Sequence, residues 1–319
     1  MVLVQSLAES TLTFLFTYWL LSALGMPAVI AESLALLAMA ASPAVLSRVV
    51  IDTRAAGPVT ERALVLSTLS TLYALTLCSA RAGMLQRGEA GLQDTLLPVL
   101  VVLGLSVVVG AVLALVLRAA LRVMSPASEN TAILLLSLIA AGAALAANFG
   151  GSAPLSALLG GMLLKQLNPR PWAWPRQMGT ASSMLTMLMF VLVSVVAAQA
   201  DWSRPVAGLV IGLVLVRMAA KVAGVALGNV GSGTSWRQGL WVGCAMSPMS
   251  SVALLLVSQY VDASGVIGRQ VAMVALPAIL LMEILGAVLA TLALYRAGEC
   301  SRPWSPVVRT TSNGPVHES

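Results

Sequence analysis

Ten stretches of the chain are long enough and apolar enough to cross a lipid bilayer. A helix needs about 20 apolar residues to span the hydrocarbon core. Inside lipid, each backbone amide and carbonyl must be hydrogen-bonded within the protein, which leaves only helices or closed barrels. The stretches lie near residues 6–24, 28–50, 63–80, 96–118, 130–147, 152–165, 180–199, 205–228, 236–258 and 268–295. The sequence therefore predicts an all-α polytopic membrane protein with about ten transmembrane helices.

Composition and rare residues exclude several other classes. Of 319 residues, 59% are hydrophobic and 9% are charged, whereas a soluble domain has about 25% charged residues. The three cysteines are too far apart in sequence to form a disulfide framework or a metal motif. The single histidine, His317, lies at the end of the chain, so an intramembrane protease built on histidine is excluded. We expect no cofactor.

The charges in the predicted loops indicate an orientation. Twelve of the 18 lysines and arginines lie on the side of the two termini and four lie on the opposite side. Loops rich in basic residues stay in the cytoplasm, which places both termini there. The remaining two, Arg217 and Lys221, fall inside the eighth segment. The loop bias accounts for the net charge of +6 without any nucleic-acid partner.

Two serine-proline pairs interrupt apolar segments in matching positions. Ser42-Pro43 lies in the second segment and Ser247-Pro248 in the ninth. A proline inside a helix removes a backbone donor and clashes with the preceding turn. Each interrupted segment is the middle one of three, and the two groups of three run in opposite directions. Paired interruptions in inverted repeats indicate the binding site of a secondary transporter. The alternative is two proline kinks that serve packing alone.

Three stretches resemble one known family. "LALLAMAASPAVLSRVV" with "ERALVLSTLSTLYALTL" is similar to the Ser-Pro-Ala-Val region of the monovalent cation:proton antiporter superfamily, which includes the bacterial sodium/hydrogen exchangers. "GGSAPLSALLGGMLL" resembles the glycine-rich middle helix of that family. "RMAAKVAGVALGNVGSGTSWRQGLWVGCAMSPMSSVALLL" resembles its lysine helix and second broken helix. The resemblance runs from about residue 28 to residue 295.

The resemblance implies a domain organisation. Residues 1–296 would form the transmembrane domain, with two inverted three-helix repeats whose broken helices cross. The repeats would cover about 6–80 and 205–295, and panel helices about 96–199. Residues 297–319 are polar and predict a disordered cytoplasmic tail. The chain begins at what resembles the third helix of the family, so the resemblance leaves a homodimer open. It also implies the bacterial inner membrane as the location.

One departure from the family concerns the ion site itself. In the family, the helix after the first broken helix carries one or two aspartates that bind the cation or the proton. The matching stretch here has no carboxylate, and Ser70 and Thr71 occupy the place. Hydroxyls coordinate a dehydrated cation but do not exchange protons near neutral pH.

The remaining intramembrane charges are the candidates for proton coupling. Lys221 matches the family lysine that pairs with the missing aspartate, and burial would disfavour its charged form. Arg217 lies one turn earlier on the same face. Glu283 lies deepest in an apolar run among the acids. We expect Lys221 or Arg217 to pair with Glu283, with Ser42, Ser247, Ser70 and Thr71 as polar ligands. The alternative is a static bridge that holds the repeats together.

These observations favour a secondary active transporter that exchanges Na⁺ or K⁺ for protons. Its partners would be the cation, protons and the lipid bilayer, and no enzymatic activity is expected. Two alternatives are a transport-inactive membrane subunit with a regulatory or structural role, and an uncoupled cation conduit. If Glu283 couples the two ions, replacing it with glutamine should abolish proton-coupled cation flux.

Overall fold

The chain is almost entirely helical. A computed structural model describes residues 2–87, 92–125, 128–167, 175–198, 204–229, 235–249 and 251–301. The helices within these residues are α1 (Val2–Ala23), α2 (Ala28–Met39), α3 (Pro43–Thr53), α4 (Pro58–Arg87), α5 (Leu92–Val123), α6 (Glu129–Asn148), α7 (Ala153–Leu167), α8 (Arg176–Ala198), α9 (Arg204–Gly228), α10 (Trp236–Ala245), α11 (Ser251–Ala263) and α12 (Ile267–Arg296).

The predicted fold class is confirmed. Each of the ten predicted segments coincides with one helix or with a consecutive pair of half-helices. Six stretches of the described residues are long and apolar enough to cross a membrane, and one of them is the interrupted pair Ala28–Thr53. The segment near residues 152–165 is the 15-residue helix α7.

Both interruptions occur at the predicted serine-proline pairs. Helix α2 ends at Met39 and α3 begins at Pro43, whose missing N–H is not needed in a first helical turn. The Ser42 hydroxyl accepts a hydrogen bond of 3.2 Å from the Val45 amide and so caps α3. In the second repeat, α10 ends at Ala245, and Ser247 lies in the non-helical stretch before α11.

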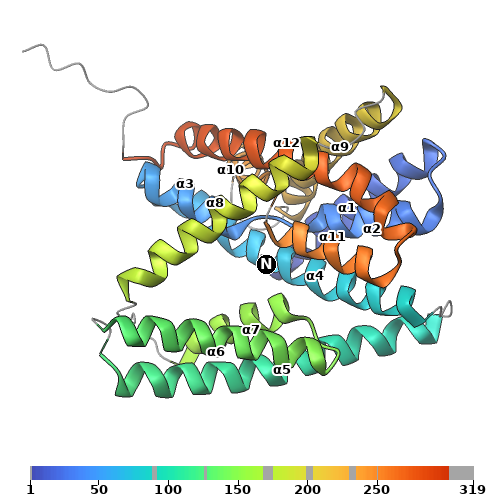
Figure 1. Cartoon of the computed structure of the whole chain (residues 1–319). Coiled ribbons are helices and arrows are strands. Elements are labelled where there is room, and N and C mark those ends of the chain that lie inside the picture. Colours follow the sequence, from blue (N-terminus) through green and yellow to red (C-terminus); the bar gives the residue numbers. More distant parts are fainter. Residues whose placement is uncertain are drawn as a thin grey trace, which may run out of the picture.

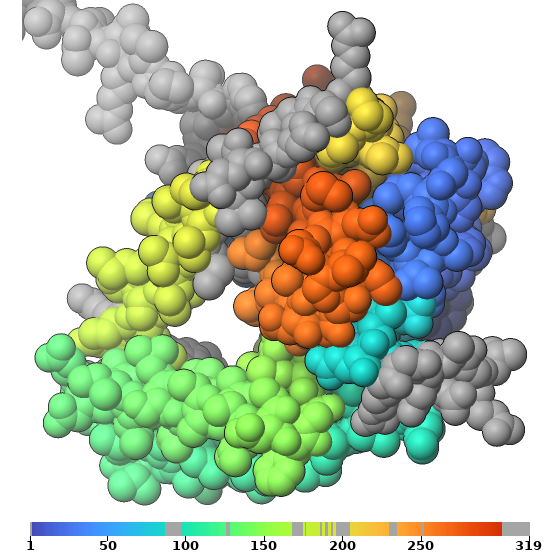
Figure 2. Space-filling model, turned by 45° about the vertical axis from the view of Figure 1, so that its right-hand side comes forward, coloured from blue at the N-terminus to red at the C-terminus, as the bar shows by residue number. Residues whose placement is uncertain are grey.

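The helices form two unequal groups (Figure 1). Helices α5, α6 and α7 pack side by side as one layer, and α4 contacts α5 and α7. Helices α1–α3 and α9–α12 gather on the other side of α4, while α8 crosses obliquely and packs on α12. The space-filling view shows a hollow bounded by α8, the α11–α12 region and the α5–α7 layer (Figure 2).

Helix α1 has a polar inner face and an apolar outer face. Its buried residues include Gln5, Glu9, Thr13 and Thr17, whereas the side chain of Trp19 is 70% exposed. This is the reverse of a soluble helix, and it suits a helix whose outer side meets lipid.

The backbones of α1 and α9 come very close together. A Cβ atom at Gly228 would lie 2.7 Å from the Cα of Gln5, and one at Gly224 would overlap the backbone of Glu9. Small residues permit this approach in membranes, where helices associate through van der Waals packing and interhelical hydrogen bonds. The Gln5 amide accordingly donates 3.1 Å to the carbonyl of Val225. The contact holds the polar face of α1 against α9.

The C-terminal end of the described chain is bonded to the start of α4. The Glu299 carboxylate accepts hydrogen bonds from the amides of Val59 (2.7 Å) and Thr60 (2.8 Å). A side chain at Gly57 would overlap Glu299. The sequence assigned residues 297–301 to a disordered tail, and that boundary is wrong because these contacts order the stretch. The rest of the predicted tail, 302–319, lies outside the described residues.

Candidate functional site

A buried ion pair joins α1 to α9. The Lys221 ammonium donates a short hydrogen bond to Oε1 of Glu9, and both side chains are 0% exposed. Lys221 also donates 3.2 Å to the carbonyl of Met39, the last residue of α2. A buried charge is tolerated in a membrane protein only when it is paired or solvated by polar groups. Because Lys221 also contacts Met39, where α2 ends, the pair lies at the first interruption.

Hydroxyl groups complete the surroundings of the Glu9 carboxylate. Ser70 on α4 donates 2.6 Å to Oε2, and Ser10 donates 3.2 Å to the same atom. Thr13 lies 3.3 Å from Oε1. All three side chains are buried. These hydroxyls therefore hold the Glu9 side chain in position.

Arg217 binds the ends of both interrupted helices. Its Nε donates 3.0 Å to the carbonyl of Ala38, and Nη2 donates 2.7 Å to that of Ala40. Its Nη1 donates 2.7 Å to the carbonyl of Ser247, which follows α10. The last carbonyls of a helix lack intrahelical partners and carry partial negative charge. The guanidinium therefore satisfies the exposed ends of α2 and α10 together and fixes their crossing.

Most of the residues singled out from the sequence meet at this crossing. Lys221 and Arg217 lie one turn apart on α9, and Ser70 reaches Glu9 from α4. Thr71 donates 2.8 Å to the carbonyl of Ala41, in the first interruption. Ser42 caps α3 and Pro43 is its first residue. The carbonyl of Ser247, next to Pro248, accepts a hydrogen bond from Arg217.

The expected partnership with Glu283 is wrong. Lys221 pairs with Glu9, and Arg217 bonds only to backbone carbonyls. Glu283 is half-buried on α12 and has no ion pair among the described residues. On that helix Met282 is fully buried and Gly286 packs against Pro248. Each step along a helix rotates the side chain by about 100°, so Glu283 lies beside the buried face of Met282 rather than on it, and Met282, not Glu283, lines the same small pocket as Arg217.

Glu9 was not identified from the sequence. It lies in the first turns of α1, near the start of an apolar segment, where an acid is ordinarily interfacial. The usable signal was the polar series Gln5, Glu9, Thr13 and Thr17, whose spacing of four places it on one helix face. Glu9 thus places a carboxylate next to Ser70, although the helix of Ser70 and Thr71 carries none at that place.

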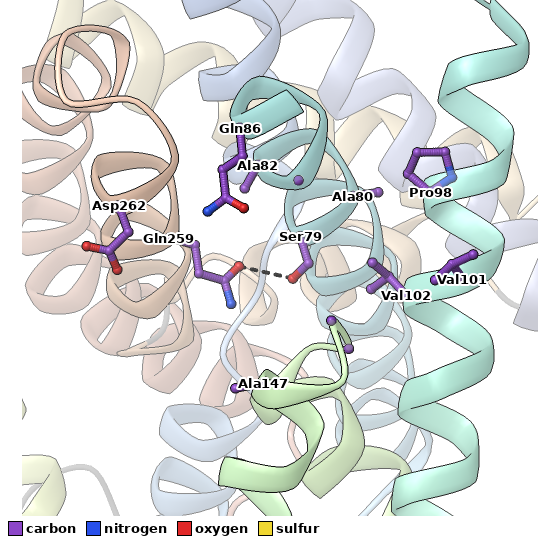
Figure 3. Close-up of a pocket in the computed structure, with 13 residues that line it drawn as sticks. Ser79, Ala80, Ala82, Gln86, Pro98, Val101, Val102, Ala147, Gln259 and Asp262 are labelled. Carbon is purple, nitrogen blue, oxygen red and sulfur yellow. Dashed lines mark hydrogen bonds between the residues drawn. The ribbon is translucent and has the colours of Figure 1, made fainter. Parts of the chain in front are cut away.

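Two cavities lie beside α4. One is nearer the N-terminal end of this helix and the other nearer its C-terminal end, with the level of Ser70 between them. The Lys165 cavity, about 570 Å³, lies between α4 and α7 and is lined by Leu64, Val65, Thr68, Leu69, Met162, Lys165 and Gln166. The Asp262 cavity, about 330 Å³, lies between α4, α5, α11 and the α6–α7 turn, and its polar lining includes Ser79, Gln86, Gln259 and Asp262 (Figure 3). In it, the Ser79 hydroxyl donates 3.0 Å to Oε1 of Gln259.

The two cavities reach different depths along α4. The Lys165 cavity extends to Leu69, the residue before Ser70. The Asp262 cavity stops at Ser79, nine residues further along, which is about 14 Å at 1.5 Å per residue. Between Ser70 and Ser79, Leu72 and Tyr73 pack in one apolar cluster with Leu155 and its neighbours on α7. The Lys165 cavity therefore reaches the level of Ser70 along α4, although Ser70 itself is fully buried.

Comparison with known proteins identifies a family and a fold. The family model described as "Sodium/hydrogen exchanger, transmembrane" matches residues 1–294. Among solved structures, the chain is similar to the sodium proton antiporter MjNhaP1 from Methanocaldococcus jannaschii, determined at pH 8, with a TM-score of 0.68 and 18% sequence identity. That match covers 92% of this chain and 78% of the antiporter chain. The search of curated proteins gave no match.

Proposed function

The chain belongs to the transmembrane sodium/hydrogen exchanger family, and from this premise we propose that it exchanges a monovalent cation for protons, with Glu9 and Lys221 as the exchanging groups. The buried pair of these two residues is the observation that carries the proposal. It provides one cation ligand and one titratable base in the same enclosed place, next to a broken helix. Both are needed for coupling, since a cation and a proton must compete for one site.

The exchange keeps the charge of the site constant. In the proton-loaded state, the Glu9 carboxylate pairs with the Lys221 ammonium. When a cation binds the Glu9 oxygens, Lys221 gives up one proton and becomes a neutral amine. One positive charge then leaves as one arrives, so no uncompensated charge is left in the low-dielectric interior. The proposed exchange is therefore electroneutral.

The ligands of the site suit a monovalent cation. Oxygen atoms are available from Glu9, Ser70, Ser10 and Thr13, and the Met39 carbonyl is released when Lys221 withdraws. Carboxylate and carbonyl oxygens replace the hydration shell of alkali cations in membrane proteins. Because only one carboxylate is present, a divalent cation would leave an excess positive charge, which burial disfavours.

Arg217 has a different role in this proposal. Its three donors already bind backbone carbonyls of both interruptions, and a guanidinium does not lose its proton in proteins. We assign to it a permanent role, in which its positive charge compensates the partial negative charge of the carbonyls at the ends of α2 and α10. The mobile charge is then confined to Lys221, one turn away.

Alternating access would occur along α4. In the present conformation the Lys165 cavity reaches the level of Ser70, and an apolar cluster closes the opposite side. In the other conformation, the α5–α7 layer would shift relative to α4 and open the path from the Asp262 cavity. The positive-inside bias of the loops assigns the Lys165 side to the cytoplasm in this proposal.

Reconstituted protein with an imposed Na⁺ or K⁺ gradient and an internal pH dye tests the function. Proton movement that requires the cation supports exchange. Cation movement without protons would identify an uncoupled conduit, and neither movement would identify a transport-inactive subunit. Glu9→Gln should abolish exchange, whereas Glu283→Gln removes an acid of α12 outside the site and is the matched control.

A further inference from the structure

The two cavities carry opposite fixed charges. Among the residues that the structure describes, Asp262 is the charged side chain that lines its cavity, and Lys165 is the charged side chain that lines the other. We propose that these two residues set the cation affinity separately at each face of the protein: Asp262 attracts the cation at its face, and Lys165 repels it at the opposite face. The proposal rests on the cation exchange proposed above.

The Asp262 cavity has the features of a capture site for a hydrated cation. Asp262 and Gln259 lie three residues apart on α11 and so share one face of the helix. Figure 3 shows the Gln259 carbonyl oxygen directed toward Ser79, which holds it with the 3.0 Å hydrogen bond. The amide groups of Gln86 and Gln259 line the same cavity, and in Figure 3 the Asp262 carboxylate lies at its outer side, turned away from Gln259. At about 330 Å³, the cavity has room for a cation that keeps part of its water shell.

Arg81 and Arg87 are the basic residues in the part of α4 that borders this cavity. Of these two, the structure describes the side chain of Arg81, which forms no ion pair with Asp262. Arg81 follows two residues after Ser79, but its guanidinium is paired with Glu32 on α2 at 2.9 Å. Asp262 itself has no ion-pair partner in the described part of the chain. Among the described residues that line the cavity, the Asp262 carboxylate is therefore a charge without an ion-pair partner.

The Lys165 cavity is built differently. Apart from the lysine, its described lining is apolar or neutral, with Thr68 and Gln166 as the polar members. Lys165 is exposed and forms no ion pair with another described residue. Low-dielectric walls focus the field of a charge at the mouth of a cleft, so Lys165 lowers the local cation concentration on the path to Ser70.

A kinetic asymmetry follows from the opposite charges. The equilibrium of exchange depends only on the two ion gradients, but the half-saturating cation concentration at each face depends on the local potential there. The cation should therefore saturate the Asp262 face at a lower concentration than the Lys165 face. With the Lys165 face in the cytoplasm, external cation should saturate the protein at a lower concentration than internal cation.

Sided transport measurements test this inference. Vesicles of each orientation are loaded so that the cation is presented to one face at a time, and KM is measured for the wild type, Asp262→Asn and Lys165→Gln. Asp262→Asn should raise KM about three- to ten-fold at its own face at low ionic strength, and leave KM at the other face unchanged. Lys165→Gln should lower KM at its own face only, so each variant is the control for the other. Both effects should shrink when choline chloride is raised to about 0.5 M, where the Debye length is only a few ångströms.

The outcomes separate this inference from the proposed function. A wild type that exchanges ions but whose variants keep both KM values unchanged refutes the sided role of the two residues alone. A variant that alters the maximal rate equally from both faces indicates a structural effect and also refutes it. Absence of cation-dependent proton movement in the wild type refutes the proposed function instead.

Discussion

Neutralising the Glu9–Lys221 pair separates a transport role from a purely structural one. Glu9→Gln keeps the shape of the side chain but leaves the Lys221 ammonium buried without its counter-ion. Removing one partner of a buried ion pair costs about 3–5 kcal/mol. Lys221→Met leaves the Glu9 carboxylate with three hydroxyl contacts, so its cost should fall near the lower end of that range.

The double variant Glu9→Gln/Lys221→Met removes both charges and keeps similar volume. Its main loss is the 3.2 Å hydrogen bond to the Met39 carbonyl, which is worth about 1–2 kcal/mol. The double variant should therefore be more stable than Glu9→Gln, and the two single costs less that of the double variant give a favourable interaction energy of about 4–7 kcal/mol in the double-mutant cycle. Equilibrium unfolding in mixed detergent micelles measures these values.

Transport by the same variants should follow a different pattern. Both single variants and the double variant should lack cation-driven proton flux, because none of them retains both exchanging groups. A double variant that is stable and inactive excludes a pair that serves folding alone. Flux retained by the double variant, or a Glu9→Gln variant as stable as the wild type, would refute the reasoning.

Four further substitutions are expected to give distinct results. Ser70→Ala removes a 2.6 Å hydrogen bond to Glu9 and should raise the cation KM in reconstituted vesicles about ten-fold. Thr71→Ala loses hydrogen bonds to two backbone carbonyls, those of Ala41 in the interruption and Ser67 on its own helix, and none to Glu9, so it should cost about 1 kcal/mol in unfolding assays and leave KM unchanged. Arg217→Met strands three buried carbonyls and should lower the free energy of unfolding by at least about 3 kcal/mol. Glu283→Gln should keep wild-type flux, and loss of coupled flux in this variant would restore it to the mechanism.

Local features made the architecture predictable from the sequence. A proline break depends on a few neighbouring residues, so Ser42-Pro43 and Ser247-Pro248 marked both interruptions correctly. Apolar length located ten segments that coincide with helices or pairs of half-helices, and six stretches of the described residues are long and apolar enough to cross a membrane. Lys221 and Arg217 stood out because basic residues inside an apolar segment are costly and rare.

The partner of Lys221 was not predictable in the same way. Glu9 and Lys221 lie 212 residues apart in sequence, and their contact depends on the close packing of α1 on α9 at Gly224 and Gly228. Glu283 was chosen because it lies deep in an apolar run, but depth along a helix does not fix the direction of a side chain. Only the neighbours of α12 determine that Met282, rather than Glu283, faces the crossing.

The central claim is that binding of a cation at Glu9 displaces one proton from Lys221. Calorimetric titration of the detergent-solubilised protein with NaCl or KCl, in two buffers of different ionisation enthalpy, counts the protons released for each cation bound. The account predicts about one proton for the wild type between pH 7 and 8, and no saturable binding heat for Glu9→Gln. Saturable cation binding by the wild type with no proton release, or proton release that persists in Glu9→Gln, would contradict the claim.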